Sequence, residues 1–216
     1  NHLIGVDYPV GSSEWMDDQI VWNLRLPRSI FALIAGAALA VGGAVMQSVM
    51  KNPLADPYTT GVSSGACFGV AVALALGIVA TSGSQMDQYG VFIFALIPVA
   101  IIILLSPRSR SPATLILAGV AVSYLFNALN TIVLISTDSE TLASVYQWQI
   151  GSLADLSWDD LLLVTLITVA GTICALAVSK KLNLLLLGDD SAKSLGLDAN
   201  SLRIVCLLIL SLMTAA

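Results

Sequence analysis

The sequence has little charge for its length. Only 11% of its 216 residues are Asp, Glu, Lys or Arg, whereas soluble domains carry roughly 25%. The apolar fraction is 57%, and the mean hydropathy is +0.89. So few charges cannot cover a surface in contact with water, which excludes an ordinary soluble domain. The apolar residues fall into long uncharged runs, a pattern typical of membrane-spanning helices.

Other chemically informative residues are also scarce. The 9 Lys and Arg residues and the net charge of −5 provide no basic patch for nucleic acid. Cys67, Cys174 and Cys206 lie far apart inside apolar runs, which indicates neither a disulfide framework nor a zinc site. The single histidine, His2, lacks the neighbouring donors of a metal site. There is no G-x-x-x-x-G-K phosphate loop. We therefore expect no catalytic residue, metal site or cofactor.

The uncharged runs predict five complete transmembrane helices and the start of a sixth. Their expected ranges are 28–48, 61–80, 91–106, 113–136 and 159–180, with the sixth at 203–216. Residues 1–27 contain no long apolar run, so we expect an aqueous loop there, and Pro27 suits the first turn of the helix that follows. The last run is shorter than the roughly 20 residues that cross a hydrocarbon core. We therefore expect the chain to be a piece of a longer protein.

Basic residues are distributed unevenly between the expected loops. If residues 1–27 lie outside, the inner loops are 49–60, 107–112 and 181–203. These loops and the helix ends beside them contain every Lys and Arg except Arg25 and Arg28. The positive-inside rule therefore predicts this orientation.

Small residues recur at every fourth position in two of the expected helices. The stripes are Gly36, Ala40, Ala44 and Ser48 in the first, and Gly61, Gly65, Gly69, Ala73 and Gly77 in the second. This spacing lets helix backbones approach closely, although part of a stripe could instead thin the wall of a transport pathway. Asn127 and Asn130 lie within one helical turn of each other and leave two alternatives open, an interhelical hydrogen bond or a pathway lining.

The inner loop 181–203 contains the signals of a short helix. Asp189 or Asp190 suits the N-cap, and Gly196 suits a left-handed residue just after the C-terminus. The result would be a helix of about two turns, far too short to span a membrane. Such a helix is either plain cytoplasmic surface or a lever inserted into a partner subunit.

Four segments of the chain carry a more specific pattern. They are R-L-P-R followed by N-P-L-A-D-P within residues 25–66, L-A-G-V-A at 117–121, W-Q-I-G-S-L at 148–153, and L-L-G-D-D-S-A-K-S-L-G-L at 186–197. From about residue 20 to its end the chain resembles the FecCD-type permeases, the membrane subunits of ATP-binding-cassette (ABC) importers for ferric siderophores, haem and vitamin B12. The resemblance implies an all-α polytopic transmembrane bundle of the type II importer class, with ten helices per subunit. This chain would hold five complete helices and the start of a sixth, all within a single permease domain.

The resemblance also implies roles for particular residues. Arg25 and Arg28 would dock the substrate-binding protein, whereas interfacial snorkelling would explain them without a partner. Asn52 and Leu54 would narrow the pathway at a cytoplasmic gate, although the two prolines of N-P-L-A-D-P would make a rigid turn in any case. The ATPase would be contacted by the 186–197 segment, through Gly188, Ala192, Leu195 and Gly196.

One part of the family pattern is missing. In the vitamin B12 importer, small hydroxylated residues just before the L-A-G stretch contribute to the gate. Pro112 and Ala113 stand at about these positions here, with Ser111 and Thr114 beside them. This departure leaves that half of the gate unassigned.

The expected function is that of a permease subunit of an ABC importer in the cytoplasmic (inner) membrane of a prokaryote. The cargo would be an iron chelate (a siderophore or haem) or cobalamin. The partners would be a separate ATPase, an extracytoplasmic binding protein, a second permease copy or paralogue, and membrane lipid, but no nucleic acid. The chain itself would not be an enzyme. A secondary, ion-coupled transporter is the alternative, but it needs a midplane ionisable site or broken repeats. A non-transporting scaffold would need no coupling helix.

Overall fold

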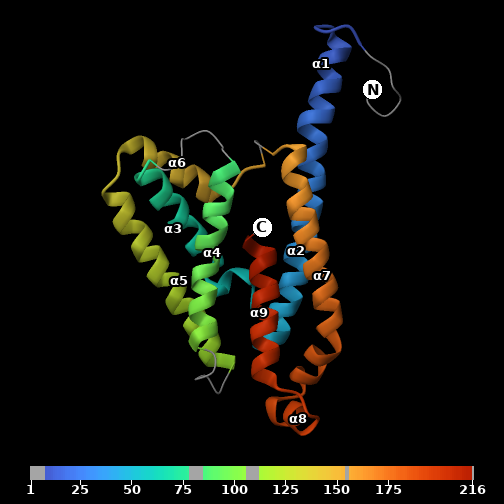
Figure 1. The fold of residues 1–216 in the computed structure, drawn as a ribbon, viewed down its shortest axis with the longest axis vertical. Coiled ribbons are helices and arrows are strands. Elements are labelled where there is room, and N and C mark those ends of the chain that lie inside the picture. Colours follow the sequence, from blue (N-terminus) through green and yellow to red (C-terminus); the bar gives the residue numbers. More distant parts are fainter. Residues whose placement is uncertain (1–7, 78–84, 106–111, 154–155, 216) are drawn as a thin grey trace.

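The computed structural model describes residues 8–77, 85–105, 112–153 and 156–215. Over these ranges the chain forms helices, turns and loops and no strand, so the expected all-α class is confirmed. Figure 1 shows two upright groups of helices with α9 between them. The elements are α1 (Ser13–Gln19), η1 (Ile20–Arg25), α2 (Leu26–Met50), η2 (Pro57–Thr60), α3 (Val62–Ala75), α4 (Gln85–Leu105), α5 (Pro112–Ile135), α6 (Ser139–Ile150), α7 (Trp158–Leu186), α8 (Asp189–Ser194) and α9 (Ala199–Ala215).

The first three elements are one continuous helix of 38 residues, so the expectation of a loop over 1–27 is wrong from Ser13 onwards. Ser12 caps its start by accepting a hydrogen bond from the Trp15 N–H at 3.1 Å. Pro27 lies inside the helix, where its missing N–H would normally break the ladder. The preceding turn widens to a π-helix instead, and the Leu26 N–H bonds to the Val21 carbonyl.

The remaining predicted spans coincide with helices, but the helices begin or end at other residues than predicted. Helix α3 ends at Ala75, short of the expected residue 80, and 78–80 lie outside the described residues. Helix α4 begins at Gln85, before the expected residue 91. Helix α7 continues to Leu186 and takes the first residues of the expected loop 181–203. Three helical segments of the described chain are long and apolar enough to cross a membrane: Ser13–Met50, Leu117–Ile135 and Trp158–Leu186.

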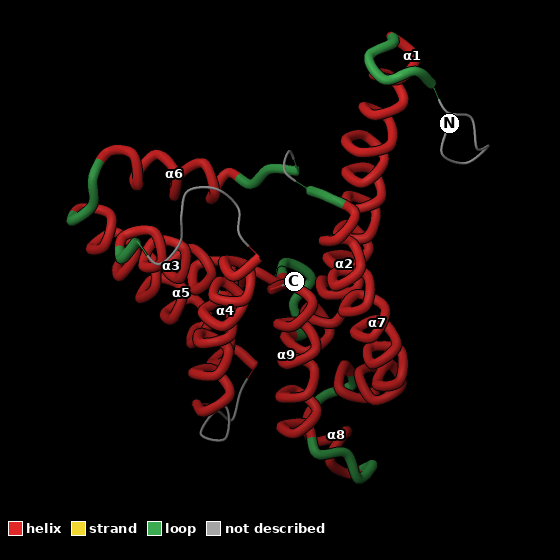
Figure 2. Tube along the Cα trace, turned by 45° about the horizontal axis from the view of Figure 1, so that its top comes forward, coloured by secondary structure: helices red, strands yellow, loops and turns green. Residues whose placement is uncertain are grey.

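Helix α6 has no counterpart among the predicted spans. It is short and half polar, so it leaves no long apolar run in the sequence. Asp138 begins it as N-cap, because its carboxylate accepts the N–H groups of Glu140 and Thr141 at 3.1 and 3.2 Å. A hydrogen bond from the Thr141 hydroxyl is the main cause that lowers the pKa of Asp138, and the two backbone N–H bonds add to it. In Figure 2, α6 lies across the upper end of the group formed by α3, α4 and α5.

The two groups of helices pack around separate clusters of buried side chains. On one side, α2, α7 and α9 enclose Val45, Val49, Ala175, Leu182, Leu185, Leu202 and Cys206. On the other side, α3 and α4 meet through Val62, Ala66, Ala95 and Val99. A third cluster joins both groups, because Leu207 and Leu210 of α9 pack with Met46 of α2 and with Ile102 and Phe126. Helix α9 therefore ties the two halves together.

Gly65 and Gly69 of the second small-residue stripe lie in a packing surface, one of the two predicted alternatives, whereas Gly77 is exposed. A Cβ added to Gly65 would lie 2.5 Å from Cγ of Pro98 and 2.7 Å from the Phe94 carbonyl oxygen. At Gly69 the same Cβ would lie 2.5 Å from the side chain of Phe94. Pro98 has no N–H to donate to Phe94, so α3 approaches α4 where its backbone ladder is interrupted.

The first stripe behaves differently. Gly36, Ala40 and Ala44 are exposed, whereas the buried face of α2 carries Ala38, Gly42, Val45 and Val49. Within the described chain, no other element covers these three residues of the stripe.

Candidate functional site

Helix α8 projects from the end of the molecule opposite α1 (Figure 1). The prediction of a short helix that ends at a left-handed Gly196 is confirmed, since this residue has φ +80°. The Leu197 N–H bonds to the Ala192 carbonyl at 2.9 Å and the Gly196 N–H to the Lys193 carbonyl at 2.9 Å, which is the Schellman pattern. The N-cap, however, is Gly188, with φ +115°, and neither of the two expected aspartates.

The four expected coupling residues occupy different environments on α8. Gly188 and Gly196 shape the two ends of the helix through their positive φ values. Ala192 is fully buried and seats the helix on the body of the protein. Leu195 is 62% exposed and is the apolar member of the set that points to solvent. A partner that docks here would meet Leu195 and the exposed Lys193.

Asp189 links α8 to two other helices instead of capping its own. Its carboxylate accepts two hydrogen bonds from Nη2 of Arg203 in α9, at 2.8 and 2.9 Å. It also accepts one from Nζ of Lys51, the residue at which α2 ends. The Arg203 hydrogen bonds are the main cause that holds the pKa of Asp189 below its usual value, and those from Lys51 add to it. Arg203 itself is only 2% exposed.

The expected gate residues follow directly after Lys51. The side-chain oxygen of Asn52 accepts the N–H of Leu54 at 2.9 Å, and its carbonyl accepts the N–H of Ala55 at 3.1 Å. Asn52 therefore holds the turn, whereas the side chain of Leu54 is 86% exposed and free to contact something else. In the other half of the expected gate, Ser111 lies outside the described residues and Pro112 begins α5.

Arg25 and Arg28 lie at the junction of η1 and α2, one turn apart on the long first helix. Arg25 is exposed and Arg28 half-buried. They are not at the helix tip, because Arg25 is about 18 Å along the axis from Ser13. Nearby, Trp22 and Trp158 contact each other with ring centroids 5.2 Å apart, and the Trp158 indole N–H bonds to the Trp22 carbonyl at 3.0 Å. Tryptophans favour membrane–water interfaces, so both alternatives for the arginines stay open.

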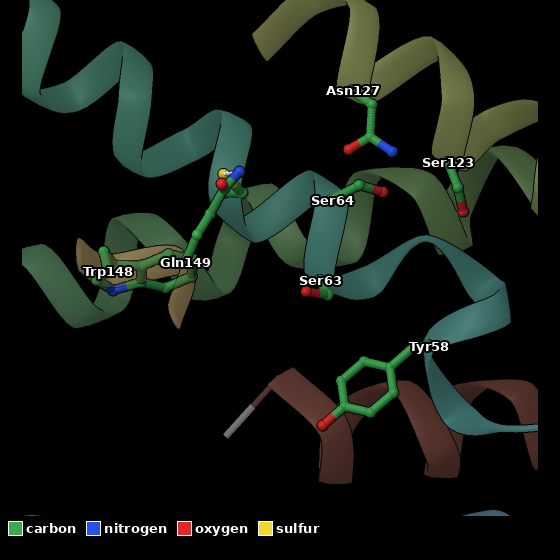
Figure 3. A pocket seen from close by; sticks show the side chains of 8 residues that line it. Tyr58, Ser63, Ser64, Ser123, Asn127, Trp148 and Gln149 are labelled. Carbon is green, nitrogen blue, oxygen red and sulfur yellow. Dashed lines mark hydrogen bonds between the residues drawn. The ribbon is translucent and has the colours of Figure 1, made fainter. Parts of the chain in front are cut away.

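A polar recess lies among η2, α3, α5 and α6 (Figure 3). Its volume is about 370 Å³. It is lined by Tyr58, Ser63, Ser64, Cys67, Ser123, Asn127, Trp148 and Gln149. The Gln149 amide donates to the Cys67 sulfur at 2.8 Å, which joins α6 to α3. Asn127 thus faces the recess, whereas Asn130 is only 5% exposed and lies inside the bundle.

Sequence reasoning missed the Lys51–Asp189–Arg203 cluster and most of the recess. Lys51 and Asp189 are 138 positions apart in the sequence, so no local pattern reveals the cluster. Arg203 was the available signal, since it is a single charge at the edge of an apolar run. The serines of the recess are ordinary in a transmembrane helix, and only their convergence distinguishes them. Among the described residues no three His, Cys, Asp or Glu side chains cluster as a metal site would require.

The chain matches known transport proteins over nearly its whole length. The FecCD transport family matches residues 5–216. The cobalamin import system permease of Halobacterium salinarum is 35% identical over 198 residues, which cover 91% of this chain and 53% of the relative. The hemin transport system permease of Yersinia pestis is 34% identical over 200 residues, which cover 91% of this chain and 60% of the relative.

The fold is also matched by a solved structure, an inward-facing conformation of a metal-chelate type ABC transporter. The TM-score is 0.85 and the identity 31%, over 97% of this chain and 66% of that chain. The chain spans 59% and 60% of the length of two other ABC permease relatives, from Methanocaldococcus jannaschii and Bacillus subtilis. The match over nearly the whole chain leaves no doubt about the family: the protein belongs to the FecCD transport family, a family of multi-pass permeases of the cytoplasmic membrane.

Proposed function

We propose that the chain is part of the membrane permease subunit of an ABC importer, powered by a separate ATPase. The observation that carries the proposal is α8, a short helix with an exposed Leu195 at one end of a bundle of this transport family. A helix of this kind contributes little to the core, since Ala192 is its buried residue. Its exposed side chains are available to a partner subunit.

The lack of a coupling site within the membrane supports an external source of energy. The apolar stretches 29–50, 117–135 and 161–179 of the described spans contain no charged side chain, and an ion-coupled carrier would need one near the membrane midplane. The charged residues of these helices lie outside the apolar stretches, as Arg28, Lys180 and Arg203 do. The same consideration disfavours the secondary transporter. The chain itself catalyses no reaction in this proposal, and the ATPase performs the hydrolysis.

We further propose that the cargo is an iron chelate (a siderophore or haem) or cobalamin, and that it passes between two permease copies or paralogues. The relatives named for cobalamin and hemin transport support this class. The polar recess supports a pathway wall on the α3–α5–α6 face. Exposed Ser63, Asn127 and Gln149 would be costly against lipid, but they suit a water-filled passage. Leu54 is the candidate gate side chain, and Asn52 supports its turn.

The orientation follows the distribution of basic residues, with α8 in the cytoplasm and the α1 end outside. An extracytoplasmic binding protein would then deliver cargo on the side of Arg25 and Arg28. The ATPase would move α8 on the opposite side, and alternating access would follow from movement of the helix groups that α9 joins.

Co-purification tests this proposal. The full-length parent, expressed with its ATPase and extracted in detergent, should retain the ATPase through affinity purification and size exclusion. Leu195→Glu should reduce the retained ATPase, because a carboxylate replaces an exposed apolar contact. Asn200→Glu, which adds a carboxylate at an exposed position outside the 186–197 segment, is the control. A wild-type permease that purifies without any ATPase would contradict the proposal.

A further inference from the structure

The cluster of Lys51, Asp189 and Arg203 occupies the point where three elements meet. Asp189 is the first residue of α8, Lys51 ends α2, and Arg203 lies near the start of α9. One carboxylate receives hydrogen bonds from both cations. The neighbouring Asp190 is exposed and lies on the same short helix. Of these two neighbouring aspartates, Asp189 is the one whose carboxylate binds the two cations.

Burial makes this cluster more than a surface ion pair. The Arg203 side chain is 3% exposed, those of Lys51 and Asp189 are 25% and 35% exposed, and Nε of Arg203 has no partner among the described residues. A buried guanidinium depends on its counter-ion, because removal of one partner leaves an uncompensated charge in a medium of low dielectric. Arg203 thus fixes Asp189 to α9, and the two hydrogen bonds define the orientation of the carboxylate.

The third member, Lys51, directly precedes the loop that contains the candidate gate residues. Lys51 has φ +52°, a left-handed conformation that is uncommon for a residue other than glycine. It is the point at which α2 stops, and Asn52 and Leu54 follow at once. Its ammonium group is held by a residue of α8. A displacement of α8 therefore acts directly on the residue that sets the path of the loop.

We propose that Asp189 is a positioning residue that transmits movement of α8 to the 52–57 loop through Lys51, with Arg203 as its anchor in α9. The inference rests on the proposed function, because it requires that the ATPase moves α8. It adds the route by which that movement reaches Leu54. The carboxylate contacts neither cargo nor nucleotide and acts through the two cations.

The test follows Leu54 and needs no knowledge of the cargo. The full-length permease–ATPase complex, with native cysteines replaced and Leu54→Cys introduced, is placed in nanodiscs. The rate of labelling by a hydrophilic maleimide is measured without nucleotide and after trapping with ATP and vanadate. In this background we expect trapping to change the rate. Asp189→Asn should reduce that change at least about fivefold, the lower range of typical coupling between sites. The amount of ATPase that co-purifies with Asp189→Asn and the rate of ATP hydrolysis should equal those of the parent complex. A general loss of structure would lower both.

Matched variants complete the design. Asp138→Asn, the same substitution at the N-cap of α6 and away from α8, should behave as the parent. Lys51→Met cuts the link to the loop but leaves the Asp189–Arg203 pair, so it carries the test if Asp189→Asn does not assemble, and Lys51→Arg should restore the response. An undiminished response in Asp189→Asn or in Lys51→Met would overturn the inference. Absence of the ATPase from the wild-type complex would instead overturn the proposed function and, with it, this inference.

Discussion

At the scale of single residues, Arg25 and Arg28 of the long first helix have two possible roles, interfacial snorkelling and docking of the binding protein. Their level on the helix is also that of the Trp22–Trp158 contact, a level that suits interfacial snorkelling as well as docking. What distinguishes the alternatives is the partner. A side chain that only snorkels is indifferent to the binding protein, whereas a docking residue meets a complementary charge on it.

We predict that Arg25→Glu with Arg28→Glu weakens docking of the binding protein by about tenfold or more, because like charges then face each other across the contact. Binding is measured with the purified permease–ATPase complex in nanodiscs at low and physiological salt. Lys180→Glu with Lys181→Glu, two exposed lysines near the other end of α7, is the matched control and should leave docking unchanged. Equal affinity for the arginine variant and the parent would show that the arginines only snorkel.

Residue patterns predicted some site features and not others. The N-P-L-A-D-P turn and Gly196 could be assigned from local sequence because their chemistry is local: an Asn side chain that closes a turn, and a glycine with positive φ. Asp189 was interpreted as a possible cap because the same local reasoning cannot see Lys51 or Arg203. Long-range ion pairs depend on how helices pack, and that packing is not written in neighbouring residues.

At the scale of elements, α8 is defined by its two ends. Gly188 and Gly196 both have positive φ, and Gly196 lies in open space, with no heavy atom near a Cβ added there. The effect of a substitution at Gly196 therefore comes from backbone conformation and not from a steric clash. The Schellman hydrogen bonds to the carbonyls of Ala192 and Lys193 depend on that conformation.

We predict that Gly196→Ala frays α8 and raises the rate of trypsin cleavage after Lys193 about tenfold, since a left-handed residue with a Cβ costs roughly 1–2 kcal/mol. The rate is measured by mass spectrometry on the folded protein in detergent. Gly196→Asn should change it much less, because Asn tolerates this conformation better. The same cleavage rate in both variants would contradict a conformational role for Gly196.

The helices were predicted with different success for identifiable reasons. Apolar runs located α2, α5 and α7 because each is long and uncharged in its middle. Helix α6 escaped because it is half polar, and its start depends on the Asp138 cap. The extension of α2 back to Ser13 escaped because Pro27 normally marks a helix start. Here the chain forms a π-helical turn before Pro27, so the helix continues through the proline. The contact between Trp22 and Trp158 stabilises this turn against α7.

At the scale of the whole molecule, the described features are arranged along the longest axis of the helix bundle. The tip of α1 and helix α6 lie at one end, and α8 lies at the other (Figures 1 and 2). The polar recess is lined in part by α6, and the ion cluster includes Asp189 of α8. Helix α9 joins both helix groups through Leu207 and Leu210. If a partner moves α8 as proposed, both helix groups can respond through α9.

In the proposed function, ATP hydrolysis by a partner subunit drives cargo through the permease. The most direct measurement reconstitutes the full-length parent with its ATPase and binding protein in proteoliposomes and follows uptake of ferric siderophores, haem and cobalamin. We predict ATP-dependent uptake of one of these classes, with none when ATP is replaced by a non-hydrolysable analogue. Uptake that proceeds without ATP and follows an imposed proton or sodium gradient would contradict the account and favour an ion-coupled carrier.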